Sequence, residues 1–134
     1  MTVDVVVVTG ADEDRRLVLV RRGREPQRGM WALPGGFVDE FEPLPDAAAR
    51  ELAEETGIGL AEPPTRVVGA YGEAGRDPRG WTVSVAYLVR LPGAVRLAPR
   101  GGDDADEARE WPVGALPPLA FDHARIVADA MGML

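Results

Sequence analysis

The chain has 134 residues, of which 46% are hydrophobic and 28% charged, a composition typical of one soluble globular domain. It contains no cysteine, which excludes disulfides, thiolate catalysis and cysteine-ligated zinc. The net charge of −7 disfavours broad electrostatic binding to nucleic acid or to anionic membranes.

The predicted elements begin with two strands. The apolar, β-branched run at 3–8 predicts a buried strand, and 17–22 predicts a second strand that forms a hairpin with it. The start of the chain carries Asp4 and no basic segment, so we interpret it as a strand and not as a signal peptide, with the cytoplasm as the default location. No apolar run approaches the roughly 20 residues that span a bilayer. A short extended piece at 30–34 follows.

The next predicted element is a helix from Asp46 to Thr56. Asp46 is suited to the N-cap position, and Gly57 is suited to the position after the last turn. Four alanines and Leu52 between them favour helix.

The second half of the chain predicts two more strands, at 65–72 and 81–90. We expect a charged loop at 100–110, followed by a short strand around 111–113. The helical spacing of apolar residues in the segment 121–134 predicts a terminal helix packed on the sheet. No repeat or linker interrupts the chain.

Three glutamates of the first helix pose a problem of charge. Glu51, Glu54 and Glu55 are spaced to share one helix face, where each pair of like charges costs a few tenths of a kcal/mol. Arg50 offsets only part of this cost. One interpretation is a solvated acidic face, and the other is a site for a divalent cation. Clustered carboxylates with no cysteine and a single histidine favour Mg²⁺ or Mn²⁺ over zinc.

The residues around these glutamates follow a fixed spacing. Gly36 is followed after five residues by Glu42, and after seven more by the run Arg50-Glu51-Leu52-Ala53-Glu54-Glu55-Thr56-Gly57-Ile58. This segment resembles the complete signature of the Nudix hydrolases, G-x5-E-x7-R-E-U-x-E-E-x-G-U with U aliphatic, and no position departs from it. The resemblance implies an α/β/α sandwich with a central mixed β-sheet and a single Nudix hydrolase domain over residues 1–134. It also implies hydrolysis of a nucleoside diphosphate linked to a second group, with divalent cations.

The same resemblance implies roles for individual residues. The implied metal ligands are three carboxylates and one main-chain carbonyl, those of Glu51, Glu54, Glu55 and Gly35. Glu51 and Glu54 also belong to the implied catalytic set with Arg50, which orients the neighbouring glutamates. Glu42 is expected to hold Arg50 or to complete the outer shell of the metal. The bound metals are Mg²⁺, with Mn²⁺ as the alternative.

The general base stays open between a glutamate of the motif and an acidic residue of the 100–110 segment. Within that segment we place Glu107 and Asp104 first. The alternative for both residues is a solvated connection.

The substrate class depends on less specific features. The segments 75–89 and 119–130 resemble Nudix proteins of the ADP-ribose pyrophosphatase type. Arg76 and Arg79 are candidates for contacts with phosphate or ribose, and the alternative is ion pairing with Asp77 within their loop.

Aromatic residues supply candidates for stacking on a base. Trp31 and Phe121 are placed first, with burial in the core as the alternative. His123 is interpreted as a structural histidine of the last helix.

We therefore expect cleavage of ADP-ribose or a nucleotide sugar to a nucleoside monophosphate and a sugar phosphate. The first alternative is pyrophosphohydrolysis of nucleoside triphosphates, including oxidised ones. The second is a non-catalytic, nucleotide-sensing Nudix module, which the intact glutamate set and the end of the sequence at residue 134 disfavour. A small nucleotide is the expected partner, without nucleic acid or membrane, and a homodimer is expected from the resemblance alone.

Overall fold

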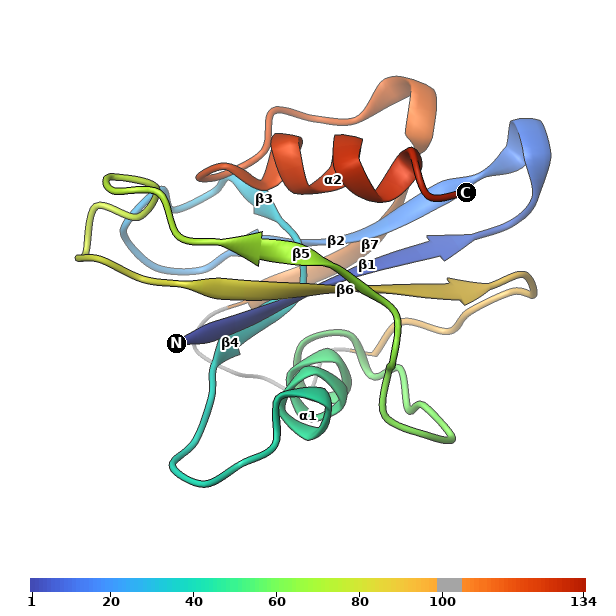
Figure 1. Ribbon diagram of the computed structural model, residues 1–134. Coiled ribbons are helices and arrows are strands. Elements are labelled where there is room, and N and C mark those ends of the chain that lie inside the picture. Colours follow the sequence, from blue (N-terminus) through green and yellow to red (C-terminus); the bar gives the residue numbers. More distant parts are fainter. Residues whose placement is uncertain (99–104) are drawn as a thin grey trace.

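The computed structural model describes residues 1–98 and 105–134. Its strands form one mixed sheet, and one α-helix covers each face of that sheet in the described part of the chain (Figure 1). The strands are β1 (Thr2–Thr9), β2 (Arg16–Arg22), β3 (Trp31–Ala32), β4 (Gly35–Phe37), β5 (Val67–Tyr71), β6 (Ser84–Leu91) and β7 (Ala105–Pro112), and the α-helices are α1 (Leu44–Thr56) and α2 (His123–Met131). The predicted α/β/α sandwich with a central mixed sheet is confirmed.

The main path of the sheet has the order β3-β2-β1-β6-β5, with β4 paired to β1 and β7 paired to β2. The central pair, β1 and β6, is parallel, whereas β1–β2 and β5–β6 are antiparallel. The hairpin predicted for the first two strands is therefore present.

Strand β1 is buried along its whole length because helices cover both of its faces. Val5 and Val7 pack in one core cluster with Leu52 of α1. Val6 and Val8 point to the other face, where they pack in the cluster that contains residues of α2. A strand covered on both sides needs apolar residues at every position, which explains the continuous run that predicted it.

Helix α1 begins at Leu44, two residues before the predicted start, so the assignment of Asp46 as N-cap is wrong. The N-cap is Pro43, and a proline in the first turn is tolerated because the N–H groups there have no partner within the helix. Gly57 ends the helix in the left-handed conformation, with φ of 79°, as predicted.

The predicted charged loop at 100–110 is wrong for its second half, which forms strand β7. β7 pairs with β2 from Pro112 to Ala105, and among the described strands it has no other neighbour. It is therefore an edge strand, and charged residues suit an edge because they oppose pairing with another chain. The terminal helix is confirmed as α2, which buries Ile126 and Ala130.

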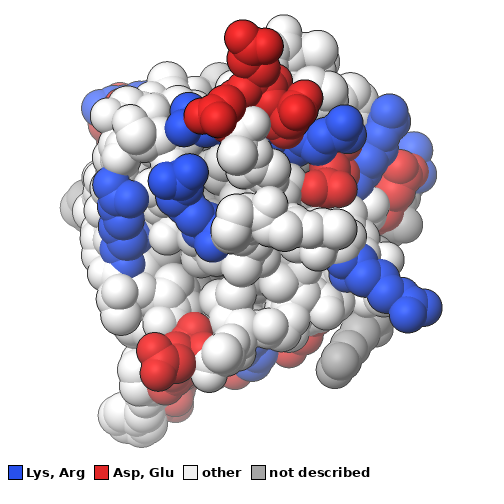
Figure 2. Space-filling view, turned by 90° about the vertical axis from the view of Figure 1, so that its right-hand side faces the viewer, with Lys and Arg blue, Asp and Glu red and all other residues white. Residues whose placement is uncertain are grey.

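The surface shown in Figure 2 carries acidic and basic side chains interspersed among uncharged ones. On this face the coloured residues form no continuous basic surface. In the described part of the chain, no helix is long and apolar enough to cross a membrane.

Replacing Gly57 with alanine is expected to lower the free energy of unfolding by about 1–3 kcal/mol. The φ of 79° strains any residue with a Cβ, and that Cβ would lie 2.5 Å from the carbonyl oxygen of Ala98. Urea denaturation measures the effect. Gly59→Ala is the matched control, because a Cβ at Gly59 meets no atom within 4 Å; an equal loss in both variants would contradict the prediction.

Candidate active site

Helix α1 carries the three glutamates in different environments. Glu51 and Glu55 are buried, with exposed fractions of 9% and 5%. The side chain of Glu54 is 52% exposed. Burying a carboxylate is costly unless a partner satisfies it, so the neighbours of Glu51 and Glu55 define what this face of the helix can hold.

Arg50 gathers the acidic groups of the motif around one guanidinium. It donates two hydrogen bonds to the carboxylate of Glu42, from Nε at 2.8 Å and from Nη2 at 2.9 Å. Its Nη1 donates to Oε1 of Glu51 at 2.8 Å, and its Nη2 donates to the carbonyl oxygen of Phe37 at 3.1 Å. Arg50 thus ties the loop that holds Glu42 to β4 and orients Glu51 on the helix.

The Arg50 guanidinium and, secondarily, the backbone N–H of Asp39 lower the pKa of Glu42 from 4.5 to about 2. The same pairing with Glu42 raises the pKa of Arg50, so the ion pair persists over the whole neutral range. This pairing makes Glu42 an unfavourable direct ligand for a cation and a suitable anchor for Arg50.

A pH-dependent stability difference is expected between the wild type and Glu42→Gln. The folded-state pKa of Glu42 is depressed, so its contribution is complete above pH 4.5 and is lost as the pH falls toward 2. Urea denaturation across that interval measures the difference. In an Arg50→Gln background the same substitution should lose this pH dependence, and its persistence there would contradict the assignment.

Strand β4 begins with two glycines, Gly35 and Gly36, and lies against the buried carboxylates of α1. The N–H of Gly35 donates to Oε1 of Glu55 at 2.7 Å. A Cβ on Gly36 would lie 2.6 Å from Cδ of Glu51, closer than real contacts allow. Gly36 thus permits an approach between strand and helix that a side chain would block, whereas a Cβ on Gly35 would collide with the carbonyl oxygen of Val3 in β1.

The donor set of this region fits a hard divalent cation. The buried groups of Glu51 and Glu55 offer only oxygen ligands, and the backbone of Gly35 lies beside Glu55. Among the described residues, no three acidic or histidine side chains converge into a preformed cluster. Glu51 instead pairs with Arg50, and Glu55 pairs with Gly35, so a cation would take over carboxylate oxygens that these donors now satisfy.

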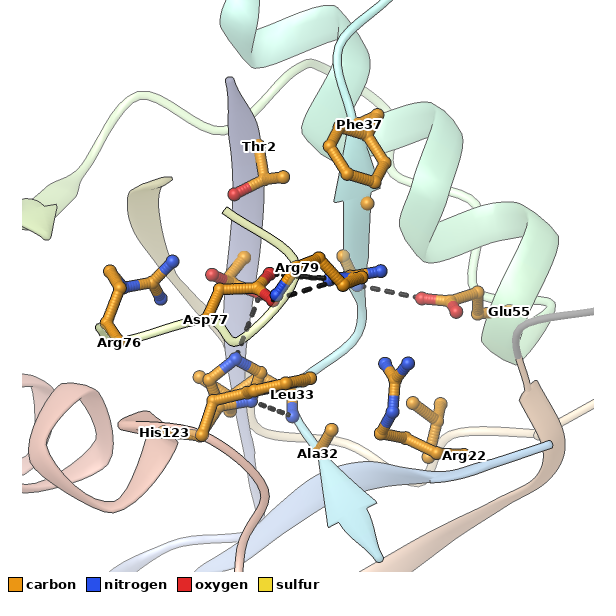
Figure 3. A pocket seen from close by; sticks show the side chains of 15 residues that line it. Thr2, Arg22, Ala32, Leu33, Phe37, Glu55, Arg76, Asp77, Arg79 and His123 are labelled. Carbon is orange, nitrogen blue, oxygen red and sulfur yellow. Dashed lines mark hydrogen bonds and ion pairs between the residues drawn. The ribbon is translucent and has the colours of Figure 1, made fainter. Parts of the chain in front are cut away.

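A cavity opens beside Glu55, between the start of β1, the end of β2 and the β3–β4 connection (Figure 3). Residues from two later segments, 76–79 and 121–123, complete its lining. The charged and aromatic residues of its wall are Asp4, Arg22, Phe37, Glu55, Arg76, Asp77, Arg79, Phe121 and His123.

Arg79 lines this cavity and lies close to two aromatic rings. Its guanidinium carbon is 5.4 Å from the ring centre of Phe37 and 5.6 Å from that of Phe121. Asp77 accepts hydrogen bonds from its Nε and Nη2, and this pairing lowers the pKa of Asp77. Arg79 therefore presents a positive charge that is fixed in position beside the cavity.

Arg76 has a different environment from Arg79. It donates two hydrogen bonds to the carboxylate of Asp122, at 2.8 and 2.7 Å, and its side chain is only 6% exposed. This pair fastens the β5–β6 loop to the residue before α2. The alternative to substrate contact for both arginines was ion pairing with Asp77. Arg79 does pair with Asp77, whereas Arg76 pairs with Asp122 instead.

The two aromatic candidates lie in different places. Phe121 lines the cavity. Trp31 does not line it and packs edge-on against Trp111, with 5.2 Å between the two ring centres. Trp31 belongs to the hydrophobic core between the sheet and α2.

The two candidate bases of the acidic segment differ as well. Asp104 lies outside the described residues. Glu107 lies on β7 opposite Arg21, 3.9 Å from its guanidinium. The alternation of β7 places Glu107 on the same face as Trp111, away from α1.

Sequence reasoning missed several residues of the cavity wall. Asp4 and Arg22 stand in strands that were predicted without any functional role. A charged residue in an otherwise apolar buried strand was the available signal for Asp4. His123 was interpreted as structural, yet it lines the cavity too.

Known proteins resemble this chain over most of its length. A family model for the NUDIX domain matches residues 1–130. The ADP-ribose pyrophosphatase of Methanocaldococcus jannaschii is 39% identical over 120 residues, which are 90% of this chain and 68% of that protein. The ADPR responsive transcriptional repressor NtrR of Acinetobacter baylyi is 37% identical over 139 residues, and the match covers all of this chain and 54% of the repressor.

The fold has a similar counterpart among solved structures. The NUDIX domain of Shewanella oneidensis NrtR, complexed with ADP ribose, superposes with a TM-score of 0.86 and 33% identity. The superposition covers 98% of this chain and 86% of that one.

Proposed function

The chain belongs to the NUDIX domain family, and from this premise we propose that it hydrolyses ADP-ribose or a similar nucleotide sugar. Water adds across the diphosphate, one phosphorus–oxygen bond breaks, and the products are a nucleoside monophosphate and a sugar phosphate. The observation that carries the proposal is the position of Glu55, a buried carboxylate of α1, in the lining of a cavity that arginine and aromatic side chains also line. The similarity to the pyrophosphatase of M. jannaschii supports the choice of ADP-ribose.

We propose that Glu51, Glu54, Glu55 and the main-chain carbonyl of Gly35 hold Mg²⁺ or Mn²⁺. When bound, the cation polarises the diphosphate and lowers the pKa of the attacking water. Arg50, held by Glu42, keeps Glu51 oriented toward β4. The pairing with Arg50 satisfies the buried carboxylate of Glu51 before a cation and the substrate bind.

The proposed general base is a glutamate of α1. Glu54 is the most exposed of the three, so water can reach it directly. Glu107 is a weaker candidate because its strand places it on the face away from α1. Asp104 stays a candidate on the sequence alone.

Arg79 and Phe121 are the proposed contacts of the substrate. The guanidinium of Arg79 is fixed by Asp77 beside the cavity and suits a phosphate oxygen. The ring of Phe121 offers a surface for a base or ribose. Arg76 then acts by holding the loop that carries Arg79, and Trp31 acts by packing in the core.

Product analysis tests the proposal. The purified protein is incubated with Mg²⁺ or Mn²⁺ and separately with ADP-ribose, nucleotide sugars, dinucleotides and nucleoside triphosphates. AMP and ribose 5-phosphate from ADP-ribose are the expected result. Pyrophosphate and a monophosphate formed only from triphosphates would replace the proposal with triphosphate pyrophosphohydrolysis.

A second candidate function is the sensing of ADP-ribose without hydrolysis. The similarity to the NtrR repressor favours it, although this chain spans about half of the length of that protein. Calorimetric titration with ADP-ribose separates the two functions. Tight binding with no metal-dependent product would favour sensing.

We also propose a small-molecule partner, a cytoplasmic location and a homodimer. The net charge of −7 disfavours binding of nucleic acid, which needs a broad positive surface. A small phosphate-bearing ligand needs only the local positive charge that a bound metal ion supplies. Phe41 and Trp81, 95% and 82% exposed, are candidates for burial between copies. Light scattering after gel filtration measures the mass in solution, and a value near the chain's 14.4 kDa would contradict the dimer.

A further inference from the structure

The single histidine of the chain, His123, lines the cavity and is 5% exposed. Its Nδ1 accepts a hydrogen bond from the backbone N–H of Leu33 at 3.0 Å (Figure 3). Its Nε2 lies 3.5 Å from Oδ1 of Asp4. A ring nitrogen that accepts a hydrogen bond carries no proton, so the proton of the neutral ring is on Nε2 and faces the carboxylate.

Asp4 continues this buried network into the centre of the sheet. Its Oδ2 accepts a hydrogen bond from Oγ of Ser84 at 2.5 Å. Asp4 also pairs with Gly35 across β1 and β4, and a Cβ on Gly35 would lie 2.7 Å from its Oδ1. His123 and Asp4 therefore contact the same short piece of backbone, at its two ends.

That piece of backbone, residues 33–35, leads directly to a proposed metal ligand. The carbonyl oxygen of Pro34 accepts a bond from Val5, and the N–H of Gly35 donates to Glu55. Without His123, the buried N–H of Leu33 would lose its partner, a cost that local movement of the chain would relieve. Such movement would shift Gly35 relative to Glu55.

We propose that His123, as the neutral Nε2–H tautomer, is a positioning residue that holds the Leu33–Gly35 backbone against Glu55 and so sets the geometry of the metal-binding groups. This inference rests on the proposed role of Glu55 and Gly35 in metal binding. It gives the last helix a part in the chemistry, because α2 begins at His123. Burial lowers the pKa of His123, against the opposing field of Asp4, which keeps the ring neutral at neutral pH.

Two substitutions separate the functions of the two ring nitrogens. In His123→Asn, the amide oxygen can occupy the place of Nδ1 and accept the bond from Leu33. In His123→Gln, the longer amide reaches the place of Nε2 and leaves Leu33 without an acceptor. Both variants remove the same ring, so a general loss of packing affects them alike.

The tautomer is tested first on the unchanged protein, by long-range ¹H–¹⁵N correlation NMR. A single histidine gives a single pair of ring-nitrogen signals, which makes the assignment direct. Protonated Nε2 and unprotonated Nδ1 are the expected result at neutral pH. The reverse tautomer, or a ring charged on both nitrogens, would overturn the proposal whatever the activity of the protein.

The positioning role is tested by Mn²⁺ affinity, measured by electron paramagnetic resonance, and by kcat/KM for ADP-ribose. His123→Gln is expected to weaken both by about 10- to 100-fold, as for other residues that orient metal ligands, whereas His123→Asn stays close to the wild type. Equal values for the two variants at equal thermal stability would overturn the proposal.

The two hypotheses fail in distinguishable ways. If the wild type hydrolyses ADP-ribose and both His123 variants keep its Mn²⁺ affinity and kcat/KM, the proposed function stands and the role of His123 is removed. The wild type could instead cleave no ADP-ribose while His123→Gln, but not His123→Asn, binds Mn²⁺ more weakly than the wild type does. That result would remove the proposed substrate and support the positioning role.

Discussion

Glu54→Gln is expected to lower kcat/KM for the cleaved nucleotide by about 10³-fold or more, with the fold unchanged. Glutamine keeps the size of the side chain and removes the charge needed both for a metal ligand and for a base. The side chain is 52% exposed, and its contacts with Arg50 are long, at 3.5 Å, so the substitution removes little folding energy.

The measurement is steady-state hydrolysis at saturating Mg²⁺, together with thermal unfolding of both proteins. Glu13→Gln is the matched control, because Glu13 is an exposed glutamate of the β1–β2 connection and does not line the cavity. Full activity of Glu54→Gln would remove Glu54 from the catalytic set. A loss of activity with a parallel loss of folding would show a structural role.

Gly36→Ala is expected to lower kcat/KM by about 10²-fold through displacement of Glu51, since a shift of about 1 Å at a reacting group has that effect. The added methyl group would lie 2.6 Å from Cδ of Glu51 and 2.7 Å from both of its oxygens. The carboxylate must move, and its bond with Arg50 must lengthen or break.

Titration with Mn²⁺ separates displacement of a ligand from a general defect. We expect Gly36→Ala to bind Mn²⁺ more weakly than the wild type, whereas Gly59→Ala, which meets no neighbouring atom, should match it. Retained affinity with normal kcat/KM would show that Glu51 is not held in the position that the structure describes.

Helix α1 and the shared face of its glutamates were predictable because both depend only on neighbouring residues in the sequence. The spacing of Glu51, Glu54 and Glu55 places them on one face of any helix, whatever the rest of the chain does. The end of that helix at Gly57 was equally local, since it depends on the conformational freedom of one residue.

Some residues of the cavity wall, such as Arg79 and Phe121, were candidates from the sequence, but the cavity itself could not be predicted because its wall depends on distant pairs. The bond between Leu33 and His123 joins residues 90 positions apart, and no pattern along the chain encodes such a distance. The first six residues of strand β7 were missed for a related reason, since the predicted strand began only at residue 111. The backbone of β7 pairs with β2, but half of its residues are charged, so the periodicity of hydrophobic residues gave no signal there.

The site is divided between one continuous segment and several separate ones. The carboxylates and glycines come from residues 35–55, whereas the opposite wall comes from the β5–β6 loop and the stretch before α2. Selection can therefore act on the two parts separately. If Arg79 contacts the substrate as we propose, changes in its loop are expected to alter the preference among nucleotides while residues 35–55 keep their sequence, so duplicated copies of such a gene could diverge in substrate and retain the same reaction.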